Sequence, residues 1–150
     1  MSCCFPNWIS GQPKPELLSF IGDHEDGYAT EYIAIPESAL TRTPSGWSAL
    51  QSATLPCAGL TVWRALIDEG NLQAGDTVLV QGSGGVSVFA LQLAKAKGAN
   101  VIATSSSSEK LDKLSSLGAD TVINYKENPE WGLSLIHISE PTRRRGISYS

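Results

Sequence analysis

The segment "GDTVLVQGSGGVSVFALQLAK", residues 75–95, constrains the fold more than any other part of the chain. Residues 77–81 form a short and largely apolar run of the kind that is buried in parallel sheets. Residues 86–97 then repeat apolar side chains at intervals of three and four, which predicts a helix that ends before Gly98. Glycines fill the turn between the two. This order is typical of the first strand, turn and helix of a dinucleotide-binding domain.

Each glycine of such a turn has a physical task. The first permits the tight turn, the second lets the backbone approach a pyrophosphate, and the third lets the helix pack close to the strand. Here these positions hold Gly82, Gly84 and Ser87; serine is small, so it weakens the third requirement without abolishing it. The helix N-terminus adds unpaired N–H groups and a partial positive charge. The residues predicted to bind the pyrophosphate are Gly82, Ser83, Gly84, Gly85 and Val86. A glycine-rich turn without a ligand is the alternative.

The rest of the chain alternates strands and helices in the same way. Residues 100–105 and 121–125 predict two further strands, and a helix capped by Ser108 is expected between them, ending near Gly118. Such an order implies an α/β fold with a doubly wound parallel sheet. Upstream, residues 48–55 and 58–70 predict helices, the second ending at Gly70. Residues 27–35, "GYATEYIAI", alternate in polarity and predict a strand.

The end of the second strand bears on the choice of cofactor. An acidic residue there would bind the ribose 2′-OH of NAD, whereas a neutral or basic site accommodates the 2′-phosphate of NADP. This chain has hydroxyl side chains from Thr104 and Ser105 to Ser108 and no acid before Glu109, and Lys110 and Tyr125 follow. We therefore predict a preference for NADP over NAD. The alternative is that the serines only cap a helix and that Lys110 only covers its solvated face.

Composition excludes several other classes of function. The chain has 150 residues and a net charge of −4, which does not favour nucleic-acid binding. No apolar run approaches the length of a membrane span, and the N-terminus has no secretory signal pattern. Three cysteines without a disulfide framework indicate a reducing compartment, and a cytoplasmic location is expected.

The last residues, 133–150, differ in composition from those before them. "LSLIHISEPTR" reads as the translation of a transposon mosaic-end sequencing adapter, so we expect this tail to be non-native and exclude it from the functional argument. As a peptide it would otherwise pass for a short strand and a basic extension.

Four motifs in order resemble the medium-chain dehydrogenase/reductase superfamily of zinc-type alcohol dehydrogenases and quinone reductases. They are "GYATEYIAIPE", "ATLPCAGLTVWRAL", residues 75–110 and "LGADTVINY". The resemblance implies that residues 1–44 are the end of a GroES-like catalytic domain and that residues 45–132 are the first half of a Rossmann domain. It also implies a small-molecule substrate and a homodimeric parent protein.

The resemblance also assigns individual residues. Thr61 matches the threonine that approaches the nicotinamide, and Lys110 and Tyr125 match residues that bind the 2′-phosphate in NADPH-dependent members. Cys57 matches a catalytic zinc ligand, but a buried small side chain is the commoner role for cysteine, and zinc is not expected here. His24 lies in an acidic loop that is expected to be solvated. No catalytic acid or base is identified.

The implied function is hydride transfer between a nicotinamide and a carbonyl, an alcohol or an activated alkene, by the protein of which this chain is a fragment. A non-catalytic NADPH-binding remnant or sensor module is the second possibility. NADPH binding without oxidation by quinones or aldehydes would distinguish the second from the first.

Overall fold

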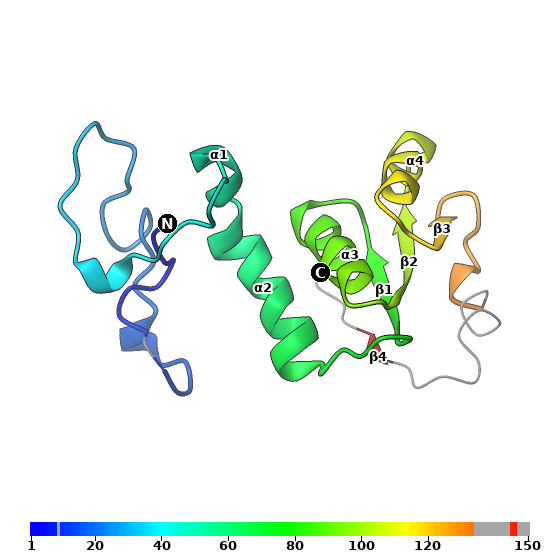
Figure 1. Cartoon of the computed structure of the whole chain (residues 1–150), viewed down its shortest axis with the longest axis horizontal. Helices are drawn as coiled ribbons and strands as arrows, with labels where there is room; N and C mark the ends of the chain where they lie inside the picture. Colours follow the sequence, from blue (N-terminus) through cyan, green and yellow to red (C-terminus); the bar gives the residue numbers. More distant parts are fainter. Residues whose placement is uncertain (9, 134–144, 147–150) are drawn as a thin grey trace. The chain divides into compact units, whose positions relative to one another are not determined.

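The computed structural model describes residues 1–8, 10–133 and 145–146. Contacts divide the chain into two compact units, Met1–Cys57 and Ala58–Ser150. This division falls later than the domain boundary predicted at residue 44, and the assignment of residues 1–44 to a catalytic domain stays a prediction. Figure 1 shows the sheet and its helices in the second unit.

The second unit contains a parallel sheet in the order β3-β2-β1-β4. Strand β1 spans Thr77–Gln81, β2 spans Asn100–Ser105 and β3 spans Thr121–Asn124. β1 pairs with β2 from Thr77 opposite Asn100 to Gln81 opposite Thr104, so both strands end at the same edge. The prediction of three parallel strands separated by helices is confirmed, and only β3 is shorter than expected, by one residue.

Helices α3, Gly85–Ala96, and α4, Ser108–Ser116, connect the three strands (Figure 1). α3 packs against β1 and β2, and α4 packs against β2 and β3. Leu91 of α3 and Val101 of β2 are fully buried, and Leu114 of α4 is 1% exposed. Both helices end before a left-handed glycine, Gly98 or Gly118, as the sequence predicts. The N-cap of α4 is Ser107 and not Ser108, so that helix begins one residue earlier than predicted.

Strand β4, Arg145–Gly146, pairs in parallel with Val78 and Leu79 on the edge of β1 away from β2. An edge strand carries unpaired N–H and C=O groups to which a short extended segment can bind. β4 falls within the tail expected to be adapter-encoded, and residues 134–144 and 147–150 lie outside the described residues. The adapter origin of the tail stays a prediction.

A helical segment with mixed winding precedes the sheet. α1, Ala49–Ser52, is followed by a π-helical turn η3, Leu55–Gly59, then α2, Leu60–Trp63, and a second π-helical stretch η4, Arg64–Glu69. α1 is a single turn held by a capping box, so the helix predicted over residues 48–55 is shorter than expected. The helix predicted over 58–70 forms and ends at Gly70 as predicted, where a methyl group would lie 2.6 Å from the Ala65 carbonyl oxygen. The left-handed residue is the next one, Asn71.

The strand predicted over residues 27–35 does not form. Among the described residues, the first unit has no strand; besides α1 and the start of η3 it has isolated bridges, Ser2 with Leu40 and Ile21 with Glu25, and two short 3-10 turns, η1 at Pro15–Leu17 and η2 at Glu37–Ala39. Tyr32 is 90% exposed, so the alternating side chains do not cover a core. The alternation was misleading because a strand also needs a neighbour to complete its hydrogen bonds.

Candidate functional site

The glycine-rich turn lies where β1 ends and α3 begins. Gly82 has a φ of +87°, a left-handed conformation that a side chain at this position would strain. Gly84 is the N-cap of α3, with extended backbone angles that any residue adopts. A methyl group added at Gly84 would meet no atom of the described residues within 4 Å, so its backbone faces open space in that part of the chain. The first glycine therefore serves the turn, and the second leaves room for a ligand to approach.

The N-terminus of α3 offers unpaired donors to such a ligand. Val88 is the first residue of the helix whose N–H finds an acceptor, the Gly84 carbonyl oxygen at 3.0 Å. The N–H groups of Gly85, Val86 and Ser87 have no acceptor among the described residues. The N–H groups of Ser83 and Gly84, in the turn itself, also have no acceptor among the described residues. These donors and the helix dipole together form the kind of site that binds a pyrophosphate.

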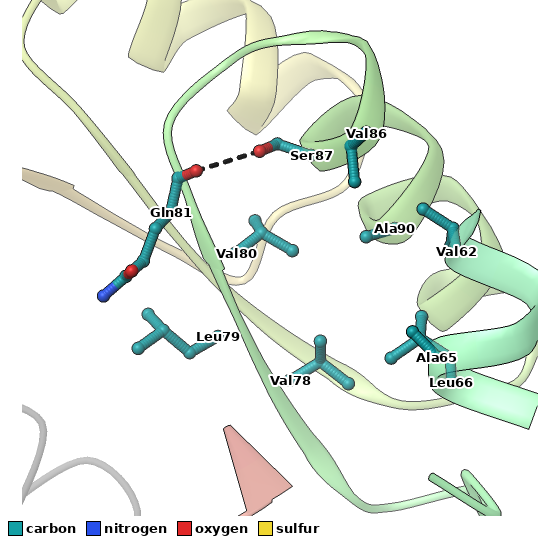
Figure 2. A pocket seen from close by; sticks show the side chains of 10 residues that line it. All are labelled: Val62, Ala65, Leu66, Val78, Leu79, Val80, Gln81, Val86, Ser87 and Ala90. Carbon is teal, nitrogen blue, oxygen red and sulfur yellow. Dashed lines mark hydrogen bonds between the residues drawn. The ribbon is translucent and has the colours of Figure 1, made fainter. Parts of the chain in front are cut away.

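The peptide group that joins Gln81 to Gly82 is bonded on both sides. Its N–H donates to the Thr104 carbonyl oxygen at 3.0 Å and lies 3.4 Å from the Thr104 hydroxyl oxygen. Its carbonyl oxygen accepts a hydrogen bond from the Ser87 hydroxyl at 2.9 Å, which Figure 2 shows. Thr104 is 2% exposed, and Ser87 is half-buried. The sequence indicated Ser87 only as an imperfect glycine and Thr104 only as one of the hydroxyl residues near a 2′-phosphate, and it gave no signal for these two bonds.

The predicted 2′-phosphate residues lie around the end of β2. The Ser105 carbonyl oxygen accepts from the Tyr125 N–H at 3.2 Å, so these two residues are neighbours. Ser105 is 3% exposed, which limits its hydroxyl as a phosphate ligand, whereas Tyr125 is 41% exposed. Lys110 is exposed in the first turn of α4, and its ammonium has no partner in the described part of the chain. Ser107, one of the serines that follow β2, makes no capping bond, and its hydroxyl has no partner among the described residues.

Thr61 is half-buried on α2, which packs against α3. An apolar pocket of about 50 Å³ lies between this helical segment, β1 and the start of α3 (Figure 2). Ligand sites of drug size measure roughly 300 Å³ or more, so this pocket is too small for a dinucleotide. The cofactor site predicted from the sequence, at the turn and the strand ends, therefore stays a prediction that this pocket does not account for.

Cys57 and His24 are the residues that sequence patterns associated with metal. Cys57 is exposed within η3, and the described residues contain no group of three or more His, Cys, Asp or Glu side chains that could hold a metal. The Cys4 thiol lies 3.8 Å from the Pro56 carbonyl oxygen. Burial raises the pKa of that thiol, and the nearby Cys57 and Cys3 raise it further. His24 lies 3.5 Å from Asp23 in an exposed loop, as expected.

Parallel strands, a left-handed glycine at the end of β1 and open N–H groups on α3 define a Rossmann-like dinucleotide-binding fold. Comparisons with known proteins give the family. A profile of the zinc-binding dehydrogenases matches residues 85–142, which include part of the tail that the sequence analysis set aside. A zinc-type alcohol dehydrogenase-like protein of Schizosaccharomyces pombe is 45% identical over 130 residues, 85% of this chain and 38% of its own length.

Solved structures agree with that relationship. The crystal structure of a "putative alcohol dehydrogenase" from Sinorhizobium meliloti 1021 superposes on this chain with a TM-score of 0.85 and 43% sequence identity. The match covers 92% of this chain and 41% of that protein. The quinone oxidoreductase of Thermus thermophilus, studied with NADPH, has a TM-score of 0.60 and 36% identity, covering 69% of this chain and 35% of its own. This chain belongs to the medium-chain dehydrogenase/reductase family of zinc-type alcohol dehydrogenases and quinone oxidoreductases. It spans less than half the length of these relatives.

In the described residues, no helix is both long enough and apolar enough to span a membrane.

Proposed function

We propose that this chain forms part of an NAD(P)-dependent oxidoreductase and holds the cofactor through the turn at residues 82–86. Such an enzyme would transfer a hydride between the nicotinamide and a carbonyl, an alcohol or an activated alkene. The observation that carries the proposal is the turn itself: Gly84 has open space beside its backbone, and the N–H groups of residues 83–87 have no acceptor among the described residues. The cofactor supplies the hydride chemistry when it is bound.

The residues of this chain have binding and orienting roles in this proposal. Gly82 sets the turn, and the N–H groups of Ser83, Gly84, Gly85 and Val86 bind the pyrophosphate oxygens. Thr61 lies on the helix that packs against α3 and approaches the nicotinamide in this proposal; its resemblance to a threonine of family members supports that role. A small-molecule substrate, a homodimeric parent protein and a cytoplasmic location belong to the same proposal. We assign no catalytic acid or base to this chain.

The cofactor preferred in this proposal is NADPH. Two features support it: no carboxylate precedes Glu109 at the end of β2, and the Lys110 ammonium is exposed and without a partner among the described residues. A neighbouring cation, Lys113, is held by Glu109 at 2.7 Å and is less available. An ammonium free to pair with a 2′-phosphate favours NADPH over NADH.

Calorimetric titration of the chain with NADPH and with NADH tests this proposal. We expect the tighter binding for NADPH. Lys110→Glu should weaken NADPH binding by about tenfold and leave NADH binding nearly unchanged. Lys97→Glu, which makes the same charge change at the far end of α3, is the matched control. Failure to bind either nucleotide would overturn the site, and equal affinity for both would overturn the NADP preference.

Turnover is a separate measurement. Oxidation of bound NADPH by quinone or aldehyde acceptors, followed by the loss of the reduced nicotinamide absorbance, distinguishes the oxidoreductase from a non-catalytic NADPH-binding module. The module binds NADPH and never oxidises it.

A further inference from the structure

We infer that Ser87 is a positioning residue for the pyrophosphate, and that its hydroxyl fixes the peptide between Gln81 and Gly82 from which the turn departs. This inference rests on the proposed cofactor site. Ser87 occupies the position of the third glycine in the motif. A glycine there would allow close packing of the helix on the strand, whereas the serine hydroxyl makes a hydrogen bond between α3 and the end of β1.

The peptide between Gln81 and Gly82 makes hydrogen bonds to two different elements, α3 and β2. The Ser87 hydroxyl in α3 donates to the Gln81 carbonyl oxygen at 2.9 Å, and Thr104 in β2 accepts from the Gly82 N–H at 3.0 Å through its carbonyl oxygen. A peptide group is planar, so bonds to its oxygen and its N–H together fix its orientation. We call this arrangement the peptide clamp, formed by Ser87, Gln81, Gly82 and Thr104.

The clamp acts on the residue where the chain turns. Gly82 follows the clamped peptide directly and has a φ of +87°. Glycine has no side chain and more conformational freedom than any other residue, so the residue itself does not hold that angle. The clamp therefore limits how far the next N–H groups, from Ser83 to Val86, can rotate away from a pyrophosphate. A binding site that is held in place before the ligand arrives loses less entropy on binding.

Three substitutions separate this role from a structural one. Ser87→Ala removes the hydroxyl, Ser87→Thr keeps it, and Ser87→Gly restores the glycine of the motif. The clamp predicts that NADPH binds about five- to tenfold more weakly to the alanine and glycine variants, as for the loss of one hydrogen bond. The threonine variant should recover much of the loss. A purely steric role for this position predicts instead that Ser87→Gly binds as well as the unchanged protein or better.

A second probe identifies the part of the nucleotide that is affected. Adenosine 2′-monophosphate has the adenosine and the 2′-phosphate but no pyrophosphate. Its dissociation constant, measured by NMR titration, should change less than about twofold in Ser87→Ala, because the clamp acts on the pyrophosphate turn. Equal weakening of both ligands would overturn the inference, since it would indicate a general disturbance of the fold. Unchanged NADPH binding in Ser87→Ala would overturn it as well.

The clamp can also be tested without any nucleotide. Amide hydrogen exchange of the ligand-free chain should show a protected Gly82 N–H that exchanges faster in Ser87→Ala, with Leu91 in the core of α3 as the unchanged reference. Exchange at Gly82 that does not respond to Ser87→Ala overturns the clamp. If NADPH fails to bind the unchanged protein while the exchange effect is present, the cofactor proposal fails and the clamp does not.

Discussion

Replacing Asp120 by asparagine removes a carboxylate that links helix α3 to strands β2 and β3. Asp120 directly precedes β3, and its carboxylate accepts from the Lys95 ammonium of α3 at 2.8 and 2.9 Å. It also accepts from the Val101 N–H, near the start of β2, at 2.6 Å. The Lys95 ammonium donates in addition to the Ala99 carbonyl oxygen at 3.1 Å. The side chain of Asp120 therefore ties the end of α3 to the beginnings of two strands.

The size of the effect follows from these contacts and their exposure. The side chains of Lys95 and Asp120 are 31% and 42% exposed, so solvent screens the ion pair and limits it to roughly 0.2–1 kcal/mol. The bond from the Val101 N–H to a charged acceptor adds about 1 kcal/mol after the same discount. We expect Asp120→Asn to lower the free energy of unfolding by about 1–2 kcal/mol. For a unit the size of Ala58–Ser150, that corresponds to a fall in Tm of roughly 4–16 °C.

The dependence on pH has a definite sign. The hydrogen bond from Lys95, followed by the one from Val101, lowers the pKa of Asp120 below its ordinary value. A carboxyl group whose pKa is lower in the folded state stabilises the fold fully above its unfolded pKa of about 3.9. That contribution is lost as the pH falls through the lower, folded value. The difference between the unchanged protein and Asp120→Asn should therefore be constant near neutral pH and shrink below about pH 4.

Urea unfolding followed by far-UV circular dichroism, at about pH 7 and about pH 3, measures both quantities. Asp112→Asn is the matched control, because Asp112 is an exposed carboxylate of α4 whose removal makes the same charge change. If Asp120→Asn changes stability no more than this control, or by the same amount at both pH values, the reasoning is refuted.

Two further predictions concern the turn and the thiols. Gly82→Ala should lower the free energy of unfolding by about 1–2 kcal/mol because the φ of Gly82 is +87°. Gly84→Ala should leave the free energy of unfolding unchanged and weaken NADPH binding, since the added methyl group would occupy the open space beside the turn. Urea unfolding and NADPH titration of both variants check this contrast, and equal stability losses would contradict it. Iodoacetamide should alkylate exposed Cys57 well before Cys4, whose thiol is half-buried and has a raised pKa; peptide mass spectrometry at neutral pH gives the order, and faster labelling of Cys4 would contradict it.

The strands and helices of the second unit could be predicted because their signals are local and agree with one another. The apolar run of β2 matches a strand that is buried from Val101 to Ser105. The glycines after α3 and α4 have the left-handed backbone that ends a helix. By contrast, residues 27–35 have the alternation of a strand, but pairing is not a local property and no neighbour completes it among the described residues. The π-helical winding of Leu55–Gly59 and Arg64–Glu69 also has no signal in residue periodicity that distinguishes it from an α-helix.

The candidate site likewise has one part that the sequence predicts and one part that it does not. The backbone part, Gly82 and the N–H groups that follow, is visible in the sequence because glycine marks the conformation that the turn requires. The side-chain part is less visible, because a serine in a helix has the same pattern whether its hydroxyl points to solvent or to a strand. Ser87 was interpreted as a weakness of the motif, yet its hydroxyl bonds the peptide that precedes the left-handed glycine.

A variable third position in the glycine motif need not mean weaker cofactor binding. Glycine there favours close packing of the helix on the strand, whereas serine can bond the strand's last carbonyl group and oppose the freedom of the first glycine. The two solutions give different responses to the same change: glycine introduced at residue 87 satisfies the motif but removes the bond. The affinity of Ser87→Gly for NADPH therefore decides whether this turn depends on the space beside β1 or on the hydrogen bond that spans it.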